Sequence, residues 1–567
     1  MYKNKKILAI IPARGGSKGI PRKNIRFLNR NPLIAYIIKT AKTSKFIDKT
    51  IVTTDDKEIG NIAYIFGADE IIERPTNLAK DHTTLDPVIF HAMNEYEQKC
   101  KESFDIIITL QPTSPLLKSS SLDTAIEKFI ENDCSALISV IPIRHLFWTK
   151  EKEKLVSFYP KRLNRQELDP VYFETGGFVI SKKEIVTVDS RIEEPMEIFE
   201  LSELEGIDID TYLDWTLVDK ILSRKKFLIR VDGDHEVGMG HIYRAVTIAS
   251  NLLEHDVKFV IKSSSDLGLA KVRSFNFEVF EIEKEEEFFD IIEKENPDIV
   301  FVDILDTEAS YLQKVKTYNP LLVSFEDLSG GLTEADLVFN AVFETDFVKD
   351  LNHVYDGYKF LCLRDEFHLV PFKTIVKDVR NLLITFGGVD QNNLSEKCLK
   401  VVEKLDLKEI DITIILGLGY KSMIELQQHV SELNKSGYNI QVLQDVKLMS
   451  QYMYKADIAI TSNGRTVYEI AALGVPCIAM AQNERETHHP FSEDAPGVIY
   501  LGLVDDRLEE KLAETLKALI PDYERRLEMN KSHLRYDLRS GVKRILRIIF
   551  DKYEEKFPSN ILNIPLE

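Results

Sequence analysis

The sequence predicts an α/β protein that arose by fusion of two proteins, each with mainly parallel sheets. The first observation is a strand, a glycine-rich loop and a helix at the N-terminus, over residues 5–45. The second is the same pattern, which begins again at residues 225–253. The third is the length of 567 residues, which exceeds the roughly 100–200 residues of one domain and predicts three or four folding units.

Short apolar runs bounded by turn residues predict the strands, and amphipathic stretches predict the helices between them. In the first half we expect strands at residues 50–55, 105–112 and 136–142 and helices at residues 33–45 and 85–99. In the second half the strands are expected in two lobes, at residues 259–262, 298–304 and 321–327 and at residues 382–388, 412–417, 457–463 and 476–482. Residues 371–380 are expected to join the lobes, and the charge-rich tail at residues 508–557 is expected to form packing helices.

These boundaries predict three domains, at residues 1–225, 226–375 and 376–567, the last with the C-terminal helices. The joint between the first two is expected in a helix around Asp214–Arg224. No linker rich in glycine, serine or proline marks this joint, so we expect the modules to pack closely.

Composition restricts the partners and the compartment. A formal net charge of −19 disfavours nucleic acids and anionic membranes. The five cysteines lie far apart and form no CxxC pair, which argues against disulfides or a zinc site and fits a reducing cytoplasm. The N-terminal apolar run of about five residues is too short for a signal peptide, and no run reaches the roughly 20 residues of a membrane span. We therefore expect a cytoplasmic protein.

A loop rich in glycine and basic residues follows the first predicted strand. Its three glycines allow the backbone to approach an anion closely. The positive charge needed to hold a triphosphate comes from Arg14, Lys18, Arg22 and Lys23. The alternative is a solvated basic loop, but this cluster stands in an acidic protein at the carboxyl end of a strand, where α/β sheets bind ligands. The spacing of a Walker loop is missing.

Asp208 and Asp210 lie two residues apart in an extended segment, so their carboxylates project from the same side. Paired carboxylates suit Mg²⁺, which bridges carboxylate and phosphate oxygens. Alone, such a pair is as often a solvated strand end. Together with the basic loop it predicts a magnesium-dependent nucleotidyl-transfer site.

Five motifs occur in the order found in the N-acylneuraminate cytidylyltransferases, which the chain resembles over about residues 5–222. They read IIPARGGSKGIPRKNI, ERPTNLAKD, LQPTSPL, RQELDPVYFETGGF and GIDIDT. The resemblance implies a nucleotidyltransferase-type α/β domain with a mainly parallel sheet, usually dimerised through a protruding element. It implies a reaction in which the anomeric hydroxyl of a nonulosonic acid attacks the α-phosphate of CTP and pyrophosphate leaves.

The same resemblance assigns roles to residues by their position in the motifs. The residues that match the family's triphosphate-handling positions are Arg14, Ser17 and Lys23, and Asn24 matches the nucleotide loop. Arg74 matches the position that recognises the cytidine end, and the floor beneath the sugar is matched by Gln111, Thr113 and Ser114. A sugar-side motif is matched by Arg165 and Gln166, and the metal ligands are matched by Asp208 and Asp210. We expect Lys23 to stabilise the transition state at the α-phosphate. Many family members have Asn-Gly where this chain has Glu174-Thr175-Gly176-Gly177 near the sugar. The choice between N-acetylneuraminic, legionaminic and pseudaminic acid therefore stays open.

The second strand–loop–helix unit places Gly238, Gly240 and His241 where a helix begins. The helix dipole favours the neutral form of a histidine at this position, which suits a base or a hydrogen-bonding role, and local packing is the alternative. Arg244, one turn further on, is expected to face the same side.

Two more glycine loops follow predicted strands of the last lobe. The first carries Gly387, Gly388, Asp390 and Asn393, the second carries Ser462, Asn463 and Gly464, and the helix after it carries Thr466 and Glu469. A glycine loop at a helix N-terminus is a ready site for a pyrophosphate. Glu469 is a candidate acceptor for the two ribose hydroxyls.

Over about residues 227–500 the chain resembles the UDP-sugar hydrolase of pseudaminic acid synthesis and its relatives fused to sugar cytidylyltransferases. The matching stretches are VDG…GxGHxxR, LRDEF, FGGxDxxN and SNGRTVYE. The resemblance implies a two-lobed GT-B-like α/β module in which His241 activates the water that releases UDP from a diacetamido sugar. Where that hydrolase has Asp-His/Asn-Tyr, this chain has Asp303-Ile304-Leu305. A glycosyltransferase and a non-catalytic sugar-nucleotide module are therefore alternatives. His488 and His489 are candidates to line the cleft, although a polar loop pair is the simpler interpretation.

The sequence thus predicts a bifunctional enzyme of nonulosonic acid biosynthesis. Its first part is expected to use CTP, a nonulosonic acid and Mg²⁺, with a different nucleotide preference as the alternative. Its second part is expected to bind, and to hydrolyse, a UDP-sugar of the same pathway. The coincidence of the two halves favours pseudaminic or a related diacetamido acid over plain sialic acid. A homodimer or a higher homo-oligomer is expected.

Overall fold

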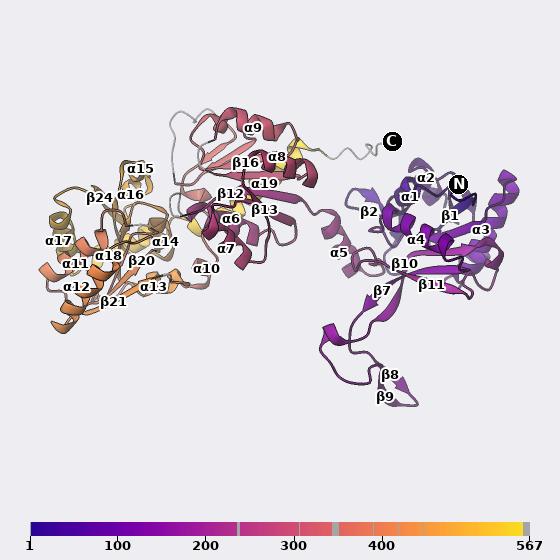
Figure 1. The fold of residues 1–567 in the computed structure, drawn as a ribbon, viewed down its shortest axis with the longest axis horizontal. Helices are drawn as coiled ribbons and strands as arrows, with labels where there is room; N and C mark the ends of the chain where they lie inside the picture. The colour runs from indigo at the N-terminus through magenta and orange to yellow at the C-terminus, as the bar shows by residue number, and fades with distance from the viewer. Residues whose placement is uncertain are drawn as a thin grey trace. The chain divides into compact units, whose positions relative to one another are not determined.

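The computed structural model describes residues 2–234, 239–304, 307–342, 351–388, 390–417, 419–444 and 446–558. It confirms the α/β class, with three large sheets in which most neighbouring strands are parallel (Figure 1). The chain divides between Ser223 and Arg224 into two compact units, called the first unit and the second unit below. None of the described helices is both long and apolar enough to cross a lipid bilayer.

The first unit contains a seven-stranded sheet in the order β11-β7-β10-β6-β1-β4-β5. Its strands are β1 (Ile7–Pro12), β4 (Lys49–Thr54), β5 (Glu70–Glu73), β6 (Ile106–Leu110), β7 (Ala136–Ile143), β10 (Val171–Lys182) and β11 (Met196–Glu200). Among them, β10 runs antiparallel to β6 and β7, and the other pairs are parallel. The carboxyl ends of β1, β4 and β6 therefore lie side by side at one edge, where parallel sheets bind ligands.

Helices cover both faces of this sheet. They are α1 (Leu33–Thr43), α2 (Lys57–Ile65), α3 (Leu85–Cys100) and α4 (Ser119–Glu131), and α5 (Tyr212–Leu222) ends the unit. Alternation along β1 explains the two layers, because Ile7, Ala9 and Ile11 pack with α1 and α4, whereas Leu8 and Ile10 pack with α3. A short pair, β2 (Phe27–Leu28) and β3 (Asn31–Pro32), precedes α1.

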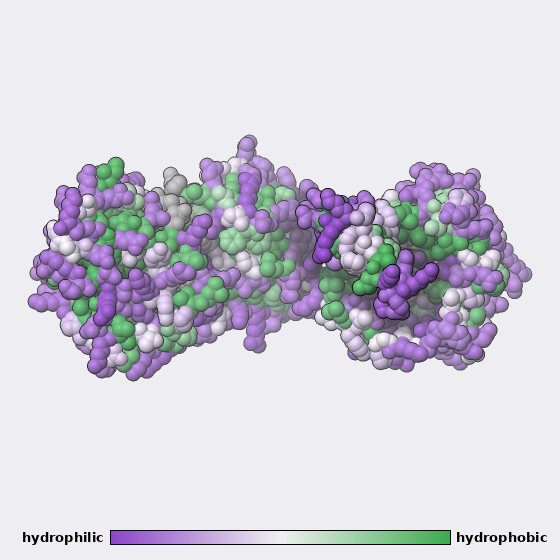
Figure 2. Space-filling view, turned by 90° about the horizontal axis from the view of Figure 1, so that it is seen from below, coloured by the Kyte–Doolittle hydropathy of each residue, from purple (hydrophilic) through white to green (hydrophobic). Residues whose placement is uncertain are grey.

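A hairpin of β8 (Trp148–Glu151) and β9 (Lys154–Ser157) stands away from the first unit's sheet (Figure 1). The hairpin and its flanks, residues 144–173, are called the arm below. The arm exposes the apolar side chains Trp148, Leu155, Val156, Phe158, Leu163, Val171, Tyr172 and Phe173. Figure 2, which looks at the molecule from below, shows hydrophobic residues interspersed with hydrophilic ones on this face.

The second unit contains two lobes, each with a parallel sheet. The first lobe has the order β14-β13-β12-β15-β16-β17-β18, with β12 (Lys226–Val231), β13 (Asp256–Lys262), β14 (Glu278–Ile282), β15 (Ile299–Asp303), β16 (Leu321–Phe325), β17 (Leu337–Asn340) and β18 (Val354–Asp356). The second lobe has the order β21-β20-β19-β22-β23-β24, with β19 (Asn381–Thr385), β20 (Asp411–Leu416), β21 (Asn439–Gln444), β22 (Ile458–Ser462), β23 (Cys477–Ala481) and β24 (Val498–Leu503). This is the two-lobed GT-B-like arrangement that the sequence predicts.

Helices connect the strands of both lobes. The first lobe has α6 (Gly240–Ser250), α7 (Asp266–Ser274), α8 (Glu286–Glu295) and α9 (Ala309–Lys316), and α10 (Glu366–Leu369) follows them. The second lobe has α11 (Leu394–Lys404), α12 (Met423–Lys435), α13 (Met449–Lys455), α14 (Arg465–Leu473), α15 (Glu484–Thr487), α16 (Phe491–Asp494), α17 (Leu508–Leu519) and α18 (Tyr523–His533), and α19 (Gly541–Lys556) ends the unit. The predicted connector at residues 371–380 contains neither a helix nor a strand.

The last helix departs from the predicted domain boundaries, which placed all of residues 376–567 in one lobe. Val542, Ile545 and Ile549 of α19 belong to the core of the first lobe. The Lys556 ammonium lies 2.7 Å from Asp336 of the same lobe. Spacings of three and four residues give α19 one apolar face, and the first lobe buries that face. The chain therefore crosses from the first lobe to the second and back.

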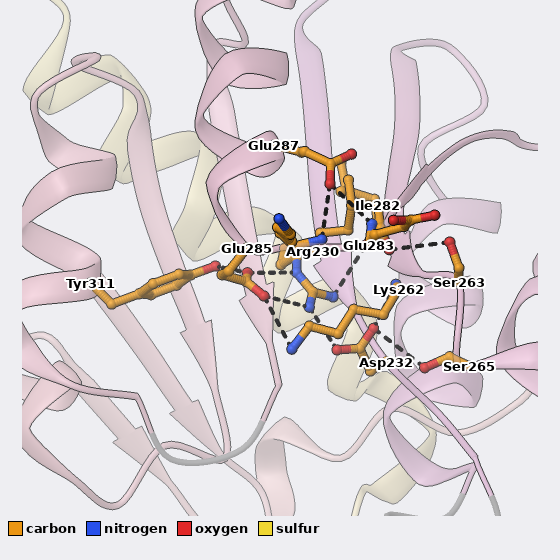
Figure 3. A network of polar contacts seen from close by, with 12 residues as sticks. Arg230, Asp232, Lys262, Ser263, Ser265, Ile282, Glu283, Glu285, Glu287 and Tyr311 are labelled. Atoms are coloured by element: carbon orange, nitrogen blue, oxygen red, sulfur yellow. Dashed lines mark hydrogen bonds and ion pairs between the residues drawn. The ribbon is translucent and has the colours of Figure 1, made fainter.

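A buried ion network lies at the carboxyl ends of β12 and β13 (Figure 3). Arg230 is fully buried, and its guanidinium donates to Glu285 at 2.9 and 3.0 Å and to Asp232 at 2.7 Å. The Lys262 ammonium and the Tyr311 hydroxyl also contact Glu285. Burial alone would raise the pKa of Glu285, but the hydrogen bonds and the charge of Arg230 outweigh burial and lower this pKa to about 2.

This network predicts a pH-dependent contribution to the stability of the second unit. Because the folded-state pKa of Glu285 is depressed, its contribution is present above the ordinary value of 4.5 and is lost as pH falls toward about 2. At neutral pH it amounts to about 3 kcal/mol. Glu285→Gln should therefore unfold at lower urea concentration at pH 7, and its difference from the parent should shrink between pH 5 and pH 3.

The matched control for this prediction is Glu281→Gln, whose carboxylate is exposed and pairs with Arg273. It should leave the urea midpoint nearly unchanged, because exposed ion pairs contribute little. A difference between Glu285→Gln and the parent that stays constant from pH 7 to pH 3 would contradict the prediction.

Candidate functional site

The basic loop of the first unit begins directly after β1, and hydrogen bonds between side chains and its backbone hold it in place. The Asn24 amide, which is buried, donates to the Arg14 carbonyl oxygen at 3.0 Å, so the two ends of the loop are joined. The Gly15 N–H donates to Asp55 at 2.9 Å, and a Cβ at this position would come within 2.9 Å of the Asp56 carboxylate. A side chain at this position would therefore have to displace the Asp56 side chain beyond the end of β4.

Carboxylates hold the cationic side chains of this loop. The Asp81 carboxylate lies 3.0 Å from the Arg14 guanidinium and 2.6 Å from the Lys18 ammonium, and Arg22 contacts Glu58. The hydrogen bond from Lys18 lowers the pKa of Asp81. Sequence reasoning missed Asp81 as a partner of the loop, although it ends the quoted ERPTNLAKD motif. A triphosphate bound by these cations would have to replace the carboxylates.

The two predicted metal ligands flank a buried residue. Ile209 packs in the core while Asp208 and Asp210 lie on the opposite side of the extended segment, with Asp208 half-buried and Asp210 exposed. Asp208 accepts hydrogen bonds from the Ser114 hydroxyl and the Gly176 N–H. Burial raises the pKa of Asp208, and the neighbouring Asp210 charge adds to this.

Lys23 connects the basic loop to the carboxylate pair. Its ammonium donates to the Ile209 carbonyl oxygen at 2.7 Å and to Asp210 at 3.2 Å, and only 14% of its side chain is exposed. Gly19 of the loop passes so close that a Cβ would lie 2.7 Å from the Asp210 carbonyl oxygen. Residues about 190 positions apart in the sequence thus form one site at the edge of the sheet.

The donor set suits a Mg²⁺ ion that also binds phosphate oxygens. The described residues contain no group of three or more His, Cys, Asp or Glu side chains arranged to hold a metal ion. Mg²⁺ in phosphoryl-transfer sites is commonly bound by one or two carboxylates, with substrate phosphates and water completing its shell. Asp208 and Asp210 supply two carboxylates beside the cationic loop, which meets that requirement.

The remaining predicted residues of the first unit divide into two groups. Arg74 is buried and donates to the Thr53 carbonyl oxygen at 2.8 Å, and burial lowers its pKa to about 10. The Ile209 N–H donates to the Thr113 carbonyl oxygen at 2.8 Å, so the segment around Thr113, with Gln111 and Ser114, borders the carboxylate pair. Ser17 lies within the basic loop, and its N–H donates to the Gly15 carbonyl oxygen.

Arg165 and Gln166 lie apart from that group, in a short turn of the arm. Both are exposed, and the Arg165 guanidinium lies 4.0 Å from Glu203. No hydrogen bond joins them to the basic loop among the described residues.

The stretch that departs from the family pattern begins with Glu174 and Thr175. Thr175 faces the core and hydrogen-bonds Ser139, while Glu174 is exposed. Gly176 leaves no room for a Cβ, which would lie 2.6 Å from the Asp208 carboxylate.

In the second unit, His241 belongs to a buried chain of charges. Its Nδ1 lies 2.5 Å from an Asp303 carboxylate oxygen. Arg244 donates through Nε to Asp303 at 2.8 Å and through Nη1 to Glu326 at 2.9 Å. The charges of Arg244 and His241 outweigh burial and lower the pKa of Asp303, whereas burial raises the pKa of Glu326. The sequence analysis named Asp303 in the stretch that departs from the hydrolase motif but did not assign it as the partner of His241, and it missed Glu326.

A pocket of about 510 Å³ lies between the two lobes of the second unit. The predicted residues Gly240, Gly388, Ser462, Gly464, Thr466 and Glu469 line it, together with residues that sequence reasoning missed: Asp234, Tyr243, Cys362, Arg364, Arg465, Gln482, Asn483 and Glu486. Arg364 pairs with Glu469 at 3.2 Å and with Glu366 at 2.7 Å. Both missed arginines were visible in the sequence, in LRDEF and SNGRTVYE.

Other predicted residues lie beside the pocket and shape it. Asp390 accepts hydrogen bonds from the N–H groups of Leu394 and Ser395, so its carboxylate caps the start of α11. Asn393 accepts from the Tyr420 hydroxyl at 2.5 Å. The Asn463 amide donates to the Glu486 and His489 carbonyl oxygens. Their assignment as substrate-binding residues stays a prediction.

The two histidines proposed for the cleft do not line the pocket. His489 is buried against Asn463, and burial lowers its pKa, while His488 is exposed. Gly238 and Leu305, which the sequence analysis singled out, lie outside the described residues.

Two family models match different parts of the chain. Residues 8–156 match the description Cytidylyltransferase, and residues 381–545 match the Glycosyltransferase family 28 C-terminal domain. The first match lies within the first unit and contains the basic loop. The second covers most of the second lobe and reaches α19.

Relatives cover each part in turn. The pseudaminic acid cytidylyltransferase of Campylobacter jejuni is 34% identical over 216 residues, which are 37% of this chain and 93% of the relative. The CMP-N,N'-diacetyllegionaminic acid synthase of Legionella pneumophila is 32% identical over 227 residues, 38% of this chain and 97% of the relative. The spore coat polysaccharide biosynthesis protein SpsG of Bacillus subtilis is 26% identical over 338 residues, 58% of this chain and 98% of the relative. An uncharacterized protein of Methanocaldococcus jannaschii is 30% identical over 274 residues, 46% of this chain, and the chain spans 56% of its length.

Proposed function

The chain belongs to the cytidylyltransferase family, and on that premise we propose that its first unit joins CMP from CTP to a diacetamido nonulosonic acid and releases pyrophosphate. The observation that carries the proposal is the Lys23 ammonium, which links the cationic loop to the Asp208–Asp210 pair. A fixed positive charge at this point can balance the charge that develops on phosphate oxygens during nucleotidyl transfer.

The choice of sugar rests on the relatives. Two of them act, by their names, on pseudaminic acid and on N,N'-diacetyllegionaminic acid, at 34% and 32% identity, and a third, the N-acylneuraminate cytidylyltransferase A of Danio rerio, is also 32% identical. The first two sugars carry two acetamido groups. We propose a diacetamido nonulosonic acid as the substrate, with N-acetylneuraminic acid as the second candidate.

Mg²⁺ is the proposed cofactor of the first unit. Asp208 and Asp210 would hold the ion, which, when bound, neutralises phosphate charge and polarises the phosphoryl group. Arg14 and Lys18 leave their ion pairs with Asp81 and then bind and orient the triphosphate. Lys23 donates a hydrogen bond to the Ile209 carbonyl oxygen, which positions its ammonium for the reacting phosphate.

For the second unit, a glycosyltransferase-like module, we propose binding and hydrolysis of a UDP-linked sugar. The supporting observation is the pairing of His241 with Asp303, next to Gly240 in the wall of the interlobe pocket. A proton on Nδ1 is stabilised by Asp303, which makes Nε2 the basic nitrogen, able to take a proton from water. Transfer of the sugar to an acceptor is the second candidate, because residues 381–545 match a glycosyltransferase domain.

Mass spectrometry of the reaction products tests both proposals. The purified chain is incubated with Mg²⁺, CTP and a panel of nonulosonic acids, and separately with UDP-linked diacetamido sugars. A CMP-sugar in the first reaction and UDP with free sugar in the second are the expected products. The first proposal is refuted if none of the acids yields a CMP-sugar. If UDP is released only when an acceptor is added, the second activity is transfer and not hydrolysis.

We further propose that the arm forms a homodimer contact, because it exposes a row of apolar side chains on a protruding hairpin. Leu155→Glu, at a side chain that is 69% exposed, should raise the dimer dissociation constant at least tenfold in size-exclusion chromatography with light scattering. Ile65→Glu is the matched control, since Ile65 of α2 is 71% exposed outside the arm. An equal shift for both variants, or none for Leu155→Glu, would contradict this assignment.

A further inference from the structure

Arg465 is the first residue of α14 and lines the interlobe pocket. It also reaches the opposite lobe. A Cβ built on Gly240 would lie 3.5 Å from the Arg465 Cδ, so the side chain rests against the residue that precedes His241. The first residue of α14 in the second lobe therefore packs against the start of α6 in the first lobe.

The Arg465 guanidinium is only partly satisfied. Nη2 donates to the Cys362 carbonyl oxygen at 3.0 Å. Nη1 is buried and has no hydrogen-bond partner among the described residues. A buried donor without a partner costs roughly 1–3 kcal/mol, and more when it is charged. An anionic group of a ligand that reached Nη1 would supply the missing partner.

The ion pairs of the neighbouring arginines point to the same conclusion. Arg364, the other arginine in the pocket wall, pairs with Glu366 and Glu469. Arg244, behind the wall, pairs with Asp303 and Glu326. Arg465 forms no ion pair with a carboxylate in the described part of the chain. Among the described residues that line this pocket, Arg465 is therefore the arginine without a carboxylate in contact, and an anionic group of a ligand can supply that contact.

The start of α14 provides a second place for negative charge. Gly464 and Thr466 line the pocket beside Arg465, and the first N–H groups of a helix have no partner within it. One phosphate at the helix start and another anionic group at the Arg465 Nη1 would use both features.

We propose that Arg465 binds the second anionic group of a nucleotide ligand, so that the pocket selects a nucleoside diphosphate sugar over a nucleoside monophosphate. The inference rests on the proposed sugar-nucleotide binding by the second unit. The shared chemistry is a pair of anionic oxygens beyond the first phosphate. The β-phosphate of a UDP-sugar carries such a pair, and so does the carboxylate of a CMP-linked nonulosonic acid.

Isothermal titration calorimetry of the full chain tests this inference with UDP, UMP and CMP-N-acetylneuraminic acid as probes. Arg465→Gln should weaken UDP binding by about 10- to 100-fold, as expected for a lost hydrogen bond to a charged group, and UMP binding by less than twofold. Arg465→Lys keeps the charge and should lose less. Binding to the first unit is common to the parent and the variants and cancels in the comparison.

Arg507→Gln is the matched control, because Arg507 is 73% exposed and its guanidinium lies 3.4 Å from Glu510 outside the pocket wall. Weaker binding of CMP-N-acetylneuraminic acid with unchanged UDP binding would overturn the selection for a diphosphate, because Arg465 would then bind the carboxylate. Unchanged binding of both UDP and the CMP-sugar, or equal losses for UMP and UDP, would overturn it while the proposed function stands. A parent whose second unit binds none of the three probes would overturn both.

Discussion

Replacing Asp210 by alanine is expected to lower the rate of CMP transfer by about 100- to 1000-fold, the range seen when one group that stabilises developing charge is removed. The Asp210 side chain is 76% exposed, so its loss should not disturb packing. Lys23 keeps its hydrogen bond to the Ile209 carbonyl oxygen in this variant. The variant therefore tests the loss of the Asp210 carboxylate alone. The measurement is steady-state pyrophosphate release from CTP and the sugar.

Two controls make this test specific. Asp189→Ala removes an exposed carboxylate of the same unit and should leave the rate unchanged. UDP-sugar turnover by Asp210→Ala should also equal that of the parent. Raising the Mg²⁺ concentration should restore part of the lost rate if the carboxylate holds the ion. A variant that transfers CMP at the parental rate would remove Asp210 from the site.

Replacing His241 by alanine is expected to affect the two activities in the opposite way. UDP release should fall by about 100- to 10,000-fold, the usual contribution of a general base, while CMP transfer stays at the parental rate. Arg244 still pairs with Asp303 and Glu326 in this variant, so both carboxylates keep a hydrogen-bonding partner. The measurement is UDP release across a range of pH.

His488→Ala is the matched control for this second prediction, because His488 is exposed and lies outside the pocket wall. It should release UDP at the parental rate. If His241→Ala also keeps that rate, the hydrolytic mechanism with this base is wrong. If the variant loses both activities while it remains folded, the assignment of two independent sites is wrong.

Much of the fold follows from local patterns. The run at residues 7–11 is apolar at every position, and β1 is indeed buried on both faces. The strand predicted at residues 50–55 corresponds to β4 (Lys49–Thr54), and the one at residues 457–463 contains β22 (Ile458–Ser462). These elements are predictable because a parallel strand between two helix layers needs apolar side chains on both sides. The return of α19 to the first lobe could not be predicted, because an apolar helix face does not specify which sheet covers it.

The residue types available for chemistry can be read from local sequence: a glycine loop with four cations, a carboxylate pair and a histidine at a helix start. Glycine content and residue spacing predict the close approach of a loop and the side of a strand on which a carboxylate projects. The partners of these residues depend on the tertiary structure. It joined Lys23 to Asp210, tied Asp81 to Arg14, and placed Asp303 against His241 and Arg465 beside Gly240. Those contacts join residues far apart in the chain, and packing of whole sheets and lobes, not local pattern, fixes such distances.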